Sequence, residues 1–257
     1  MMSHFSATPL LAALLGGFWL SAALIVRSRG HIGGIELATV ALWLCSLAVL
    51  GIAIAQLSVG GFFRKEGFFA VLPGFWVPMI PFAISGALLL GVPAFRRALW
   101  AIGAHLPARA MVLIHGLRIA AIGGVAKGFA GVLPASFALP VGIPDLLFGA
   151  SALLVGVLWP KGGLSRRTLI VWNIIGIAVI VPSAPLLMQM GLPGPLYTFA
   201  RAPDARVLFE FPLVLAPTLI VPLFIFTNAV HAAVLWNGMR GERPSTQTPS
   251  ASTRSSI

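Results

Sequence analysis

Long apolar blocks alternate with short polar segments along the whole chain. Each block is close to the roughly 20 residues that an α-helix needs to cross a hydrocarbon layer about 30 Å thick. The pattern predicts an all-α fold, a polytopic membrane helix bundle with about seven transmembrane helices. The predicted spans are residues 8–26, 37–57, 74–95, 110–127, 140–159, 168–190 and 211–236.

The composition agrees with a lipid environment. Hydrophobic residues make up 58% of the chain and charged residues 9%, whereas a soluble domain carries about a quarter of its residues as Asp, Glu, Lys and Arg. The net charge of +11 does not indicate nucleic-acid binding, because no folded polar domain is present to carry a basic face. The basic residues lie in short loops beside the apolar blocks, which is typical of membrane proteins.

The distribution of these basic residues predicts an orientation. Eleven of the seventeen Lys and Arg residues lie in the loops after the first, third and fifth spans or in the C-terminal tail, and the more basic side of a membrane protein is its cytoplasmic side. The first span follows no positive charge, unlike a cleaved signal peptide, so we expect it to be retained with the N-terminus outside. Residues 1–236 then form the transmembrane domain, and the polar segment 237–257 is expected to be a disordered cytoplasmic tail.

Few polar side chains lie inside the predicted spans. An ionisable group at the bilayer centre costs about 2.5–3.5 kcal/mol on insertion scales, so such residues are candidates for a binding site or a transport path. His115 and Arg118 are three residues apart on the fourth span, and Asn228 and His231 have the same spacing on the seventh, so each pair shares a helix face. The six candidates are Arg118, Asp145, His115, His231, Asn228 and Asn173.

Arg118 and Asp145 form the candidate charged pair. Asp145 is expected about 8 Å from the outer end of its span and Arg118 about 13 Å from that end, a difference that a long arginine side chain can bridge. Lys127 at the outer rim is a rival partner. The pair is either a structural ion pair or a site in which Arg118 binds an anionic group, with His115 or His231 as a proton carrier.

The polar residues of the fourth, sixth and seventh spans are expected at similar depths and form one buried layer if these helices adjoin. A simpler interpretation is hydrogen bonding between helices, worth about 0.6 kcal/mol on average. A haem between the two histidines is another alternative, since bis-histidine ligation needs two facing imidazoles. Neither a Cys-x-x-Cys-His motif nor a His-x-x-x-His pair is present, and no cofactor or metal is expected.

Prolines and glycines supply a second set of expectations. Pro140 and Pro144 are expected to open the fifth span directly before the buried acid, with backbone carbonyls freed toward the polar region as in transporter sites. An ordinary kinked helix is the alternative. Gly116, Gly123 and Gly124 of the fourth span are interpreted as positions where helices approach closely.

Two segments carry a resemblance. RIAAIGGVAKGFAGVLPASFALPVGIPDLLFGASA begins at Arg118, and FPLVLAPTLIVPLFIF precedes Asn228. Together they resemble a group of uncharacterised bacterial multi-pass membrane proteins, in which an Arg-bearing helix leads to an LP-x-x-FALP-x-G-x-x-D-x-x-x-G segment. That group has a His shortly after the third proline of its last helix, whereas this chain has Asn228 at about that place and His231 one turn later. The resemblance implies a bacterial inner-membrane protein and assigns no activity. The matching residues are Arg118, Leu133, Pro134, Phe137, Ala138, Leu139, Pro140, Gly142, Asp145 and Gly149.

The sequence therefore predicts a membrane protein that binds or translocates a small molecule or ion through an intramembrane polar site. The charged pair and the two histidines are expected to line the path. A membrane-embedded enzyme or haem-binding redox subunit is one alternative, and a non-catalytic membrane partner of a complex is another. The expected partners are the lipid bilayer and an unknown small molecule or ion, not nucleic acid.

Overall fold

The computed structural model describes residues 6–65, 67–71, 76–199 and 203–241, and in this part of the chain every regular element is a helix. Six stretches are long and apolar enough to cross a membrane, and a bent helix pair raises the number to as many as seven. The elements of the first part of the chain are α1 (Thr8–Ser28), α2 (Gly34–Val59), η1 (Phe62–Arg64), α3 (Phe68–Val71), α4 (Trp76–Gly91) and α5 (Pro93–His105). Those of the second part are α6 (Ala108–Leu113), η2 (Ile114–Ala120), α7 (Ala121–Phe129), α8 (Ala135–Val157), α9 (Arg166–Ala178), α10 (Ser183–Met190), η3 (Ala205–Phe209), η4 (Ala216–Ile220) and α11 (Val221–Gly241).

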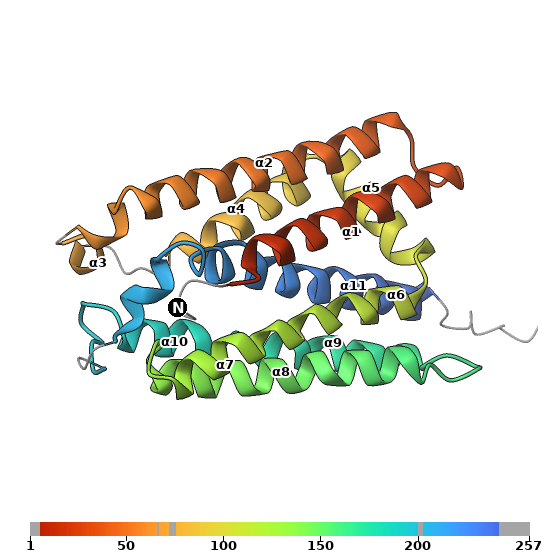
Figure 1. Cartoon of the computed structure of the whole chain (residues 1–257). Coiled ribbons are helices and arrows are strands. Elements are labelled where there is room, and N and C mark those ends of the chain that lie inside the picture. The colour runs from red at the N-terminus through yellow and green to blue at the C-terminus, as the bar shows by residue number, and fades with distance from the viewer. Residues whose placement is uncertain (1–5, 66, 72–75, 200–202, 242–257) are drawn as a thin grey trace, which may run out of the picture.

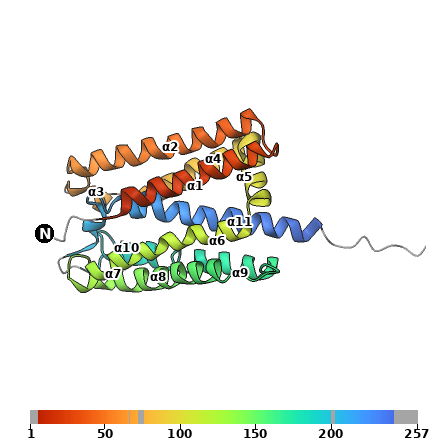
Figure 2. The ribbon, with the colours of Figure 1, turned by 45° about the vertical axis from the view of Figure 1, so that its right-hand side comes forward.

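The helices form two groups with α11 between them (Figures 1 and 2). We call α1, α2, α4 and α5 the first half of the bundle, and the continuous stretch α6–η2–α7 together with α8, α9 and α10 the second half. α11 packs against α4 and α5 on one side and against α9 on the other. As a result, 56% of the apolar stretch of Ala216–Met239 is buried, against 22–33% in the other five candidate spans.

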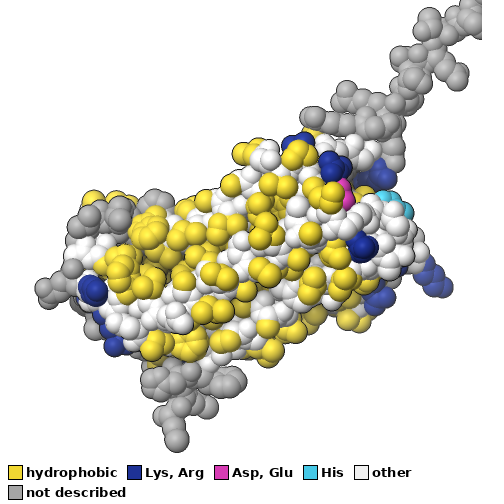
Figure 3. Space-filling view, turned by 90° about the horizontal axis from the view of Figure 1, so that it is seen from above, with side chains coloured by type: hydrophobic (Ala, Val, Ile, Leu, Met, Phe, Trp, Pro, Cys, Tyr) yellow, Lys and Arg dark blue, Asp and Glu magenta, His cyan; other side chains and the backbone are white. Residues whose placement is uncertain are grey.

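The outer surface matches a lipid surrounding. Large apolar side chains such as Leu42, Ile52, Leu147 and Ile174 are more than half exposed on the outside of the bundle. Figure 3 shows apolar side chains over the middle of one face and Lys and Arg side chains gathered toward its two ends. A water-exposed helix keeps its apolar stripe inside, so this arrangement is that of helices that span a membrane.

The third predicted span, residues 74–95, is not one straight helix. α4 ends at Gly91, and α5 begins at Pro93 and turns away by 102°. Proline has no amide hydrogen and its ring disfavours helical geometry in the residue before it, and Val92 is accordingly extended. α5 buries one face and carries Arg96 and Arg97 on its exposed face, so it lies across the end of the bundle.

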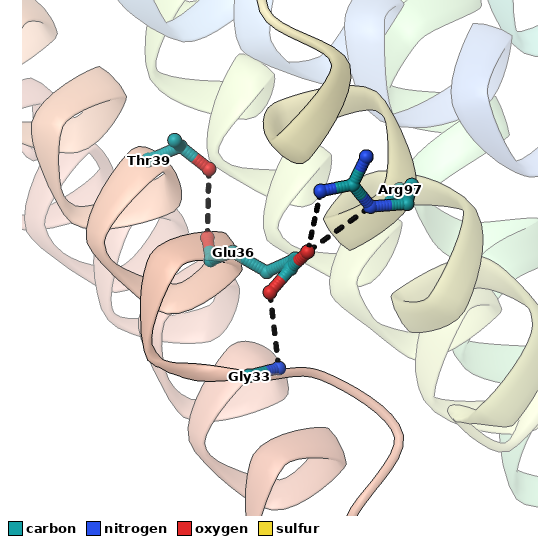
Figure 4. Close-up of polar contacts among 4 residues, drawn as sticks. All are labelled: Gly33, Glu36, Thr39 and Arg97. Carbon is teal, nitrogen blue, oxygen red and sulfur yellow. Dashed lines mark hydrogen bonds and ion pairs between the residues drawn. The ribbon is translucent and has the colours of Figure 1, made fainter.

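A charged contact fixes α5 to the start of α2 (Figure 4). The carboxylate of Glu36 accepts hydrogen bonds from the Arg97 Nε and Nη2 at 3.0 and 2.8 Å and from the Gly33 backbone amide at 3.1 Å. The Gly33 amide is one of the backbone amides at the N-terminus of α2 that have no partner within the helix. An acidic side chain in the first turn commonly accepts a hydrogen bond from such an amide. The hydroxyl of Thr39 donates to the Glu36 carbonyl at 2.7 Å.

The core of the first half is aromatic. Trp19 and Trp43 are fully buried, with ring centroids 5.5 Å apart in an edge-to-face arrangement, and Phe226 of α11 contacts both. Their indole nitrogens donate to Thr227 Oγ1 at 3.2 Å and to Ser85 Oγ at 2.9 Å. Each buried polar atom of these two rings thus has a partner, as buried indoles usually do.

The second half is held by close backbone approach. Gly142, Gly149 and Gly156 recur every seven residues on α8 and face α7, η2 and α6 in turn. A Cβ at Gly149 would lie 2.6 Å from the Ile119 amide nitrogen, closer than van der Waals contact allows. The repeat therefore lets the fourth span lie directly against α8 along most of its length.

Two further boundaries differ from the sequence-based prediction. α8 begins at Ala135, so Pro140 and Pro144 lie inside the helix and do not open it. The sixth predicted span is found as one candidate span, Arg166–Met190, which contains α9 and α10. α11 continues to Gly241, and the rest of the predicted tail, residues 242–257, lies outside the described residues.

Candidate functional site

Arg118 lies in η2, in the middle of the fourth span, and its side chain is fully buried. Its Nε donates to Asp145 Oδ1 at 2.5 Å, and its Nη1 donates to the Gly176 carbonyl of α9 at 3.0 Å. The rings of Phe148 and Phe224 lie 4.6 and 5.5 Å from its Cζ atom, within the range of cation–π attraction. The guanidinium therefore joins η2, α8, α9 and α11.

Asp145 is the more accessible partner of the pair. It lies ten residues into α8, about 15 Å from the N-terminal end of that helix at 1.5 Å per residue, because the helix begins earlier than the sequence suggested. Its side chain is 15% exposed, whereas that of Arg118 is 0% exposed. Among the described residues only Oδ1 has a hydrogen-bond partner, so Oδ2 is left to accept a further hydrogen bond.

A cavity of about 700 Å³ adjoins this pair. Both Arg118 and Asp145 belong to its wall, and the other contributions come from the start of α1, α4, α7, α8, α10, η4 and α11. Most of the wall is apolar, with Met79, Phe82 and Ile122 among its side chains. A volume of this size lies within the range of about 300–1,000 Å³ found for small-molecule sites.

Gly123 and Gly124 face this cavity and not a neighbouring helix. A Cβ placed on either would meet no atom within 4 Å, and both belong to the cavity wall. Their interpretation as close-packing positions is therefore wrong. Gly116 does pack closely, against Leu153 of α8.

The loop before α11 supplies another part of the wall through Leu208 and Leu213. This loop is tied down by Asp204, which accepts hydrogen bonds from the Arg206 side chain and from the Tyr197 hydroxyl at 3.0 Å. Burial alone would raise the pKa of Asp204, but the hydrogen bonds from Arg206 and Tyr197 outweigh it and lower that pKa below its ordinary value. The carboxylate is thus ionised at neutral pH and holds the loop in place.

His115 and Asn228 lie behind the pair, away from the cavity wall. Both are fully buried, and neither the ring nitrogens of His115 nor the amide atoms of Asn228 have a hydrogen-bond partner among the described residues. The His115 ring contacts Phe148, Trp172 and Phe224, with centroid distances of 5.5–5.8 Å. Leaving a buried polar group unsatisfied costs about 1–3 kcal/mol, so these groups carry a cost that a fully hydrogen-bonded core does not have.

Asn173 and His231 form a separate buried contact. The Asn173 Nδ2 lies 3.1 Å from the His231 Nδ1 and donates to the Leu169 carbonyl at 2.7 Å. Neither residue belongs to the cavity wall. The structure thus brings Arg118 and Asp145 to the cavity, and places the other four candidates in the adjacent helix contacts between α9, η2 and α11.

The geometry around the histidines offers no space for a haem. The exposed fractions of His115 and His231 are 0% and 1%, and three aromatic rings surround His115. A macrocycle bound to a His115 nitrogen would have to displace at least one of these rings. Among the described residues, no group of three or more His, Cys, Asp or Glu side chains is arranged to hold a metal ion.

Comparison with known proteins places these residues in a family. The family model described as a domain of unknown function, DUF8737, matches residues 75–236. The chain belongs to this family. The DUF8737 region extends from the start of α4 into α11 and contains all six candidate residues, whereas α1 and α2 precede it. Neither curated proteins nor solved structures give a match to the chain.

Three residues of the site were missed by sequence reasoning. Gly176 accepts from Arg118 through its carbonyl, and Phe148 and Phe224 cover the guanidinium. Glycine and phenylalanine are common in membrane spans, so composition gives them no signal. The spacing of Phe148 three residues after Asp145, on the same helix face, is the one pattern that could have indicated a role.

Proposed function

We propose that this DUF8737 protein binds a small molecule in its intramembrane cavity and moves it, or an ion, across a bacterial inner membrane. The observation that carries the proposal is the buried Arg118–Asp145 pair in the wall of the cavity of about 700 Å³. A charged pair inside a bundle is costly to bury and is a functional candidate by default in membrane proteins. A purely structural ion pair needs no adjoining cavity.

The position of the pair supports transport as well as binding. Asp145 lies about 15 Å into α8, which is near the middle of a hydrocarbon layer about 30 Å thick. Transporter sites commonly lie at this depth, between groups of helices that can move relative to one another. Here the cavity receives walls from both halves of the bundle and from α11 between them.

The charge distribution supports seven spans, with the N-terminus outside and the C-terminus in the cytoplasm. Arg27, Arg29, Arg96, Arg97 and Arg109 lie in or beside the connections at the α5 end. The opposite connections carry fewer basic residues, and the positive-inside rule makes the α5 end cytoplasmic. Reporter fusions after residue 236 test this arrangement: a fluorescent protein should be active there and a periplasmic phosphatase inactive, and the reverse result overturns the orientation.

The cavity itself is tested by filling it. Gly124→Leu adds a side chain toward the cavity, where a Cβ meets nothing within 4 Å, and leaves the charged pair intact. Gly17→Leu on α1 is the matched control, since its Cβ also meets nothing and the residue is not part of the cavity wall. Both proteins and the wild type are purified from membranes, and organic extracts are compared by mass spectrometry.

The expected result is a small molecule that accompanies the wild type and Gly17→Leu and is lost from Gly124→Leu. The folded state of each protein is checked by size-exclusion chromatography, and Gly123→Leu serves as a second cavity-filling variant. The proposal is overturned if the same molecules accompany all the proteins equally, or if none accompanies the wild type.

A further inference from the structure

The side chains of Arg118 and Asp145 are not equally accessible from the cavity. The Arg118 guanidinium is 0% exposed, with Nε and Nη1 engaged and its faces covered by Phe148 and Phe224. Its remaining nitrogen, Nη2, has no hydrogen-bond partner among the described residues, but it is buried as well. Asp145 is 15% exposed and has Oδ2 without a hydrogen-bond partner among the described residues. The group that a ligand meets is therefore a carboxylate oxygen, not the guanidinium.

The charge balance of the pair limits the kind of ligand. An anion would have to displace the side chains that enclose Arg118 before it could reach the buried Nη2, the one guanidinium nitrogen without a hydrogen-bond partner among the described residues. Lys127 also belongs to the cavity wall, but it already has an interaction of its own. A cation would meet a carboxylate that Arg118 already neutralises, and would leave a net charge in a mostly apolar cavity. A neutral hydrogen-bond donor uses the free Oδ2 position and leaves the charge unchanged.

The rest of the wall favours an apolar body. Leu11, Phe82, Ile122 and Phe137 are among the side chains around the cavity. Burying apolar ligand surface against such side chains is favourable by about 25 cal/mol per Å² relative to water. Met79 and Ile122 line the cavity and are 40% and 57% exposed, so this part of the wall offers accessible apolar surface to a ligand.

We infer that the cavity takes a neutral, mostly apolar molecule with a single hydrogen-bond-donating head, such as the hydroxyl of a long-chain alcohol, and that the head donates to Asp145 Oδ2. This inference rests on the proposed function, since it names the ligand class of the same cavity. It replaces the sequence-based expectation of an anionic ligand, because Arg118 is enclosed by its partners.

The test uses four probes that share a 12-carbon chain. 1-Dodecanol donates a hydrogen bond, its methyl ether only accepts, dodecanoate is an anion and dodecylammonium is a cation. Saturable binding of tritiated 1-dodecanol to the full-length protein in lipid nanodiscs is measured against empty nanodiscs, and the other probes are used as competitors. The expected result is that the methyl ether, dodecanoate and dodecylammonium each compete at least about tenfold more weakly than unlabelled 1-dodecanol.

Variants assign the discrimination to the carboxylate. Replacing both members of the pair by apolar residues, Arg118→Met with Asp145→Leu, leaves no unpaired charge and should make 1-dodecanol and its methyl ether equal competitors. Glu210→Gln is the control, because Glu210 pairs with Arg64 at the surface and is not part of the cavity wall; it should keep the wild-type preference. Gly124→Leu, which does not touch the pair, should abolish saturable 1-dodecanol binding.

Failure of this inference is distinguishable from failure of the proposed function. If dodecanoate or dodecylammonium binds more tightly than 1-dodecanol and this binding is lost in Gly124→Leu, the ligand class is wrong and the cavity remains a binding site. The class is equally wrong if no probe binds saturably while a co-purified molecule still disappears in Gly124→Leu. Absence of any cavity-dependent molecule in the extracts overturns the proposed function itself.

Discussion

The two halves of the bundle bury their polar atoms in different ways. In the first half, the indoles of Trp19 and Trp43 donate to hydroxyl groups, and their rings form a packed aromatic cluster. In the second half and α11 lie all the buried side-chain atoms that lack a hydrogen-bond partner among the described residues. The buried charged pair and the glycine repeat are also there. The first half thus has the features of a structural support. The second half contains a buried charged pair and buried polar atoms without a partner in the described part of the chain, which are costly to bury and which a structural support does not need.

This difference agrees with the extent of the family match. The DUF8737 region contains α4, α5, the second half and α11 as far as residue 236, but neither α1 nor α2. Strained or unsatisfied groups tend to gather at functional sites, where the surrounding structure holds them in place. Arg118 and the residues that contact it, which the proposed function makes part of the ligand site, all lie within the family region.

The largest expected effect comes from breaking the charged pair. Asp145→Leu leaves the fully buried Arg118 without its carboxylate, which should lower the free energy of unfolding by about 3–5 kcal/mol. The pair in the first half, Glu36 with Arg97, has an Arg side chain that is 62% exposed, so Arg97→Gln should lower the free energy of unfolding much less than Asp145→Leu does. Thermal unfolding of the purified proteins in one detergent compares the two.

The double variant Arg118→Met with Asp145→Leu controls for the loss of charge itself. Replacing a buried pair by apolar side chains of similar volume is often neutral, so this protein should regain most of the stability lost in the single variant. Equal unfolding temperatures for Asp145→Leu and the wild type would contradict the view that the second half depends on the pair.

The next largest effect compares a glycine at a close contact between helices in the second half with a glycine of the first half that has no such contact. Gly149→Ala places a methyl group 2.6 Å from the Ile119 amide nitrogen, and overpacking of this kind should cost about 1–3 kcal/mol. Gly17→Ala in α1 meets no atom within 4 Å and should be neutral or stabilise by up to about 1 kcal/mol, because alanine favours helix over glycine. The unfolding temperatures of both variants are compared with that of the wild type. An unchanged unfolding temperature for Gly149→Ala would show that α8 and η2 are not in close contact.

Removing a buried polar group that has no hydrogen-bond partner should raise the free energy of unfolding instead of lowering it. His115→Leu replaces a fully buried imidazole, neither of whose nitrogens has a partner among the described residues, and should stabilise by about 1 kcal/mol. Asn173→Leu removes the contact to His231 and the bond to the Leu169 carbonyl, so it should destabilise. A loss of stability in His115→Leu would mean that the imidazole has polar partners in the membrane.

The sequence alone gave much of the fold because lipid imposes length and hydrophobicity on each span. The sequence did not predict α5 as a separate helix, because an amphipathic helix with two arginines does not form an apolar block. It also placed the start of the fifth span too late, since proline was treated as a helix boundary although Pro140 and Pro144 are accommodated inside α8.

The candidate site was predictable only where a residue carries charge. Arg118 and Asp145 stood out as costly inside a membrane, and the structure shows them in contact. The enclosure of the guanidinium depends on Gly176, Phe148 and Phe224, which come from three helices and have unremarkable identities. Which of the two charges faces the cavity is therefore a property of helix packing that no linear pattern reports.

The smallest expected effect comes from removing one hydrogen bond in the first half. It tests whether the hydrogen-bonded polar groups there stabilise the protein. Ser85→Ala removes the acceptor of the Trp43 indole and keeps the ring packed against Trp19 and Phe95. Hydrogen bonds between membrane helices average about 0.6 kcal/mol, so the unfolding temperature should fall slightly. His115→Leu also exchanges a buried polar side chain for an apolar one, yet its expected sign is opposite, because Ser85 accepts a hydrogen bond and His115 does not. If both substitutions shift the unfolding temperature in the same direction, the two halves do not differ in how they satisfy their buried polar atoms.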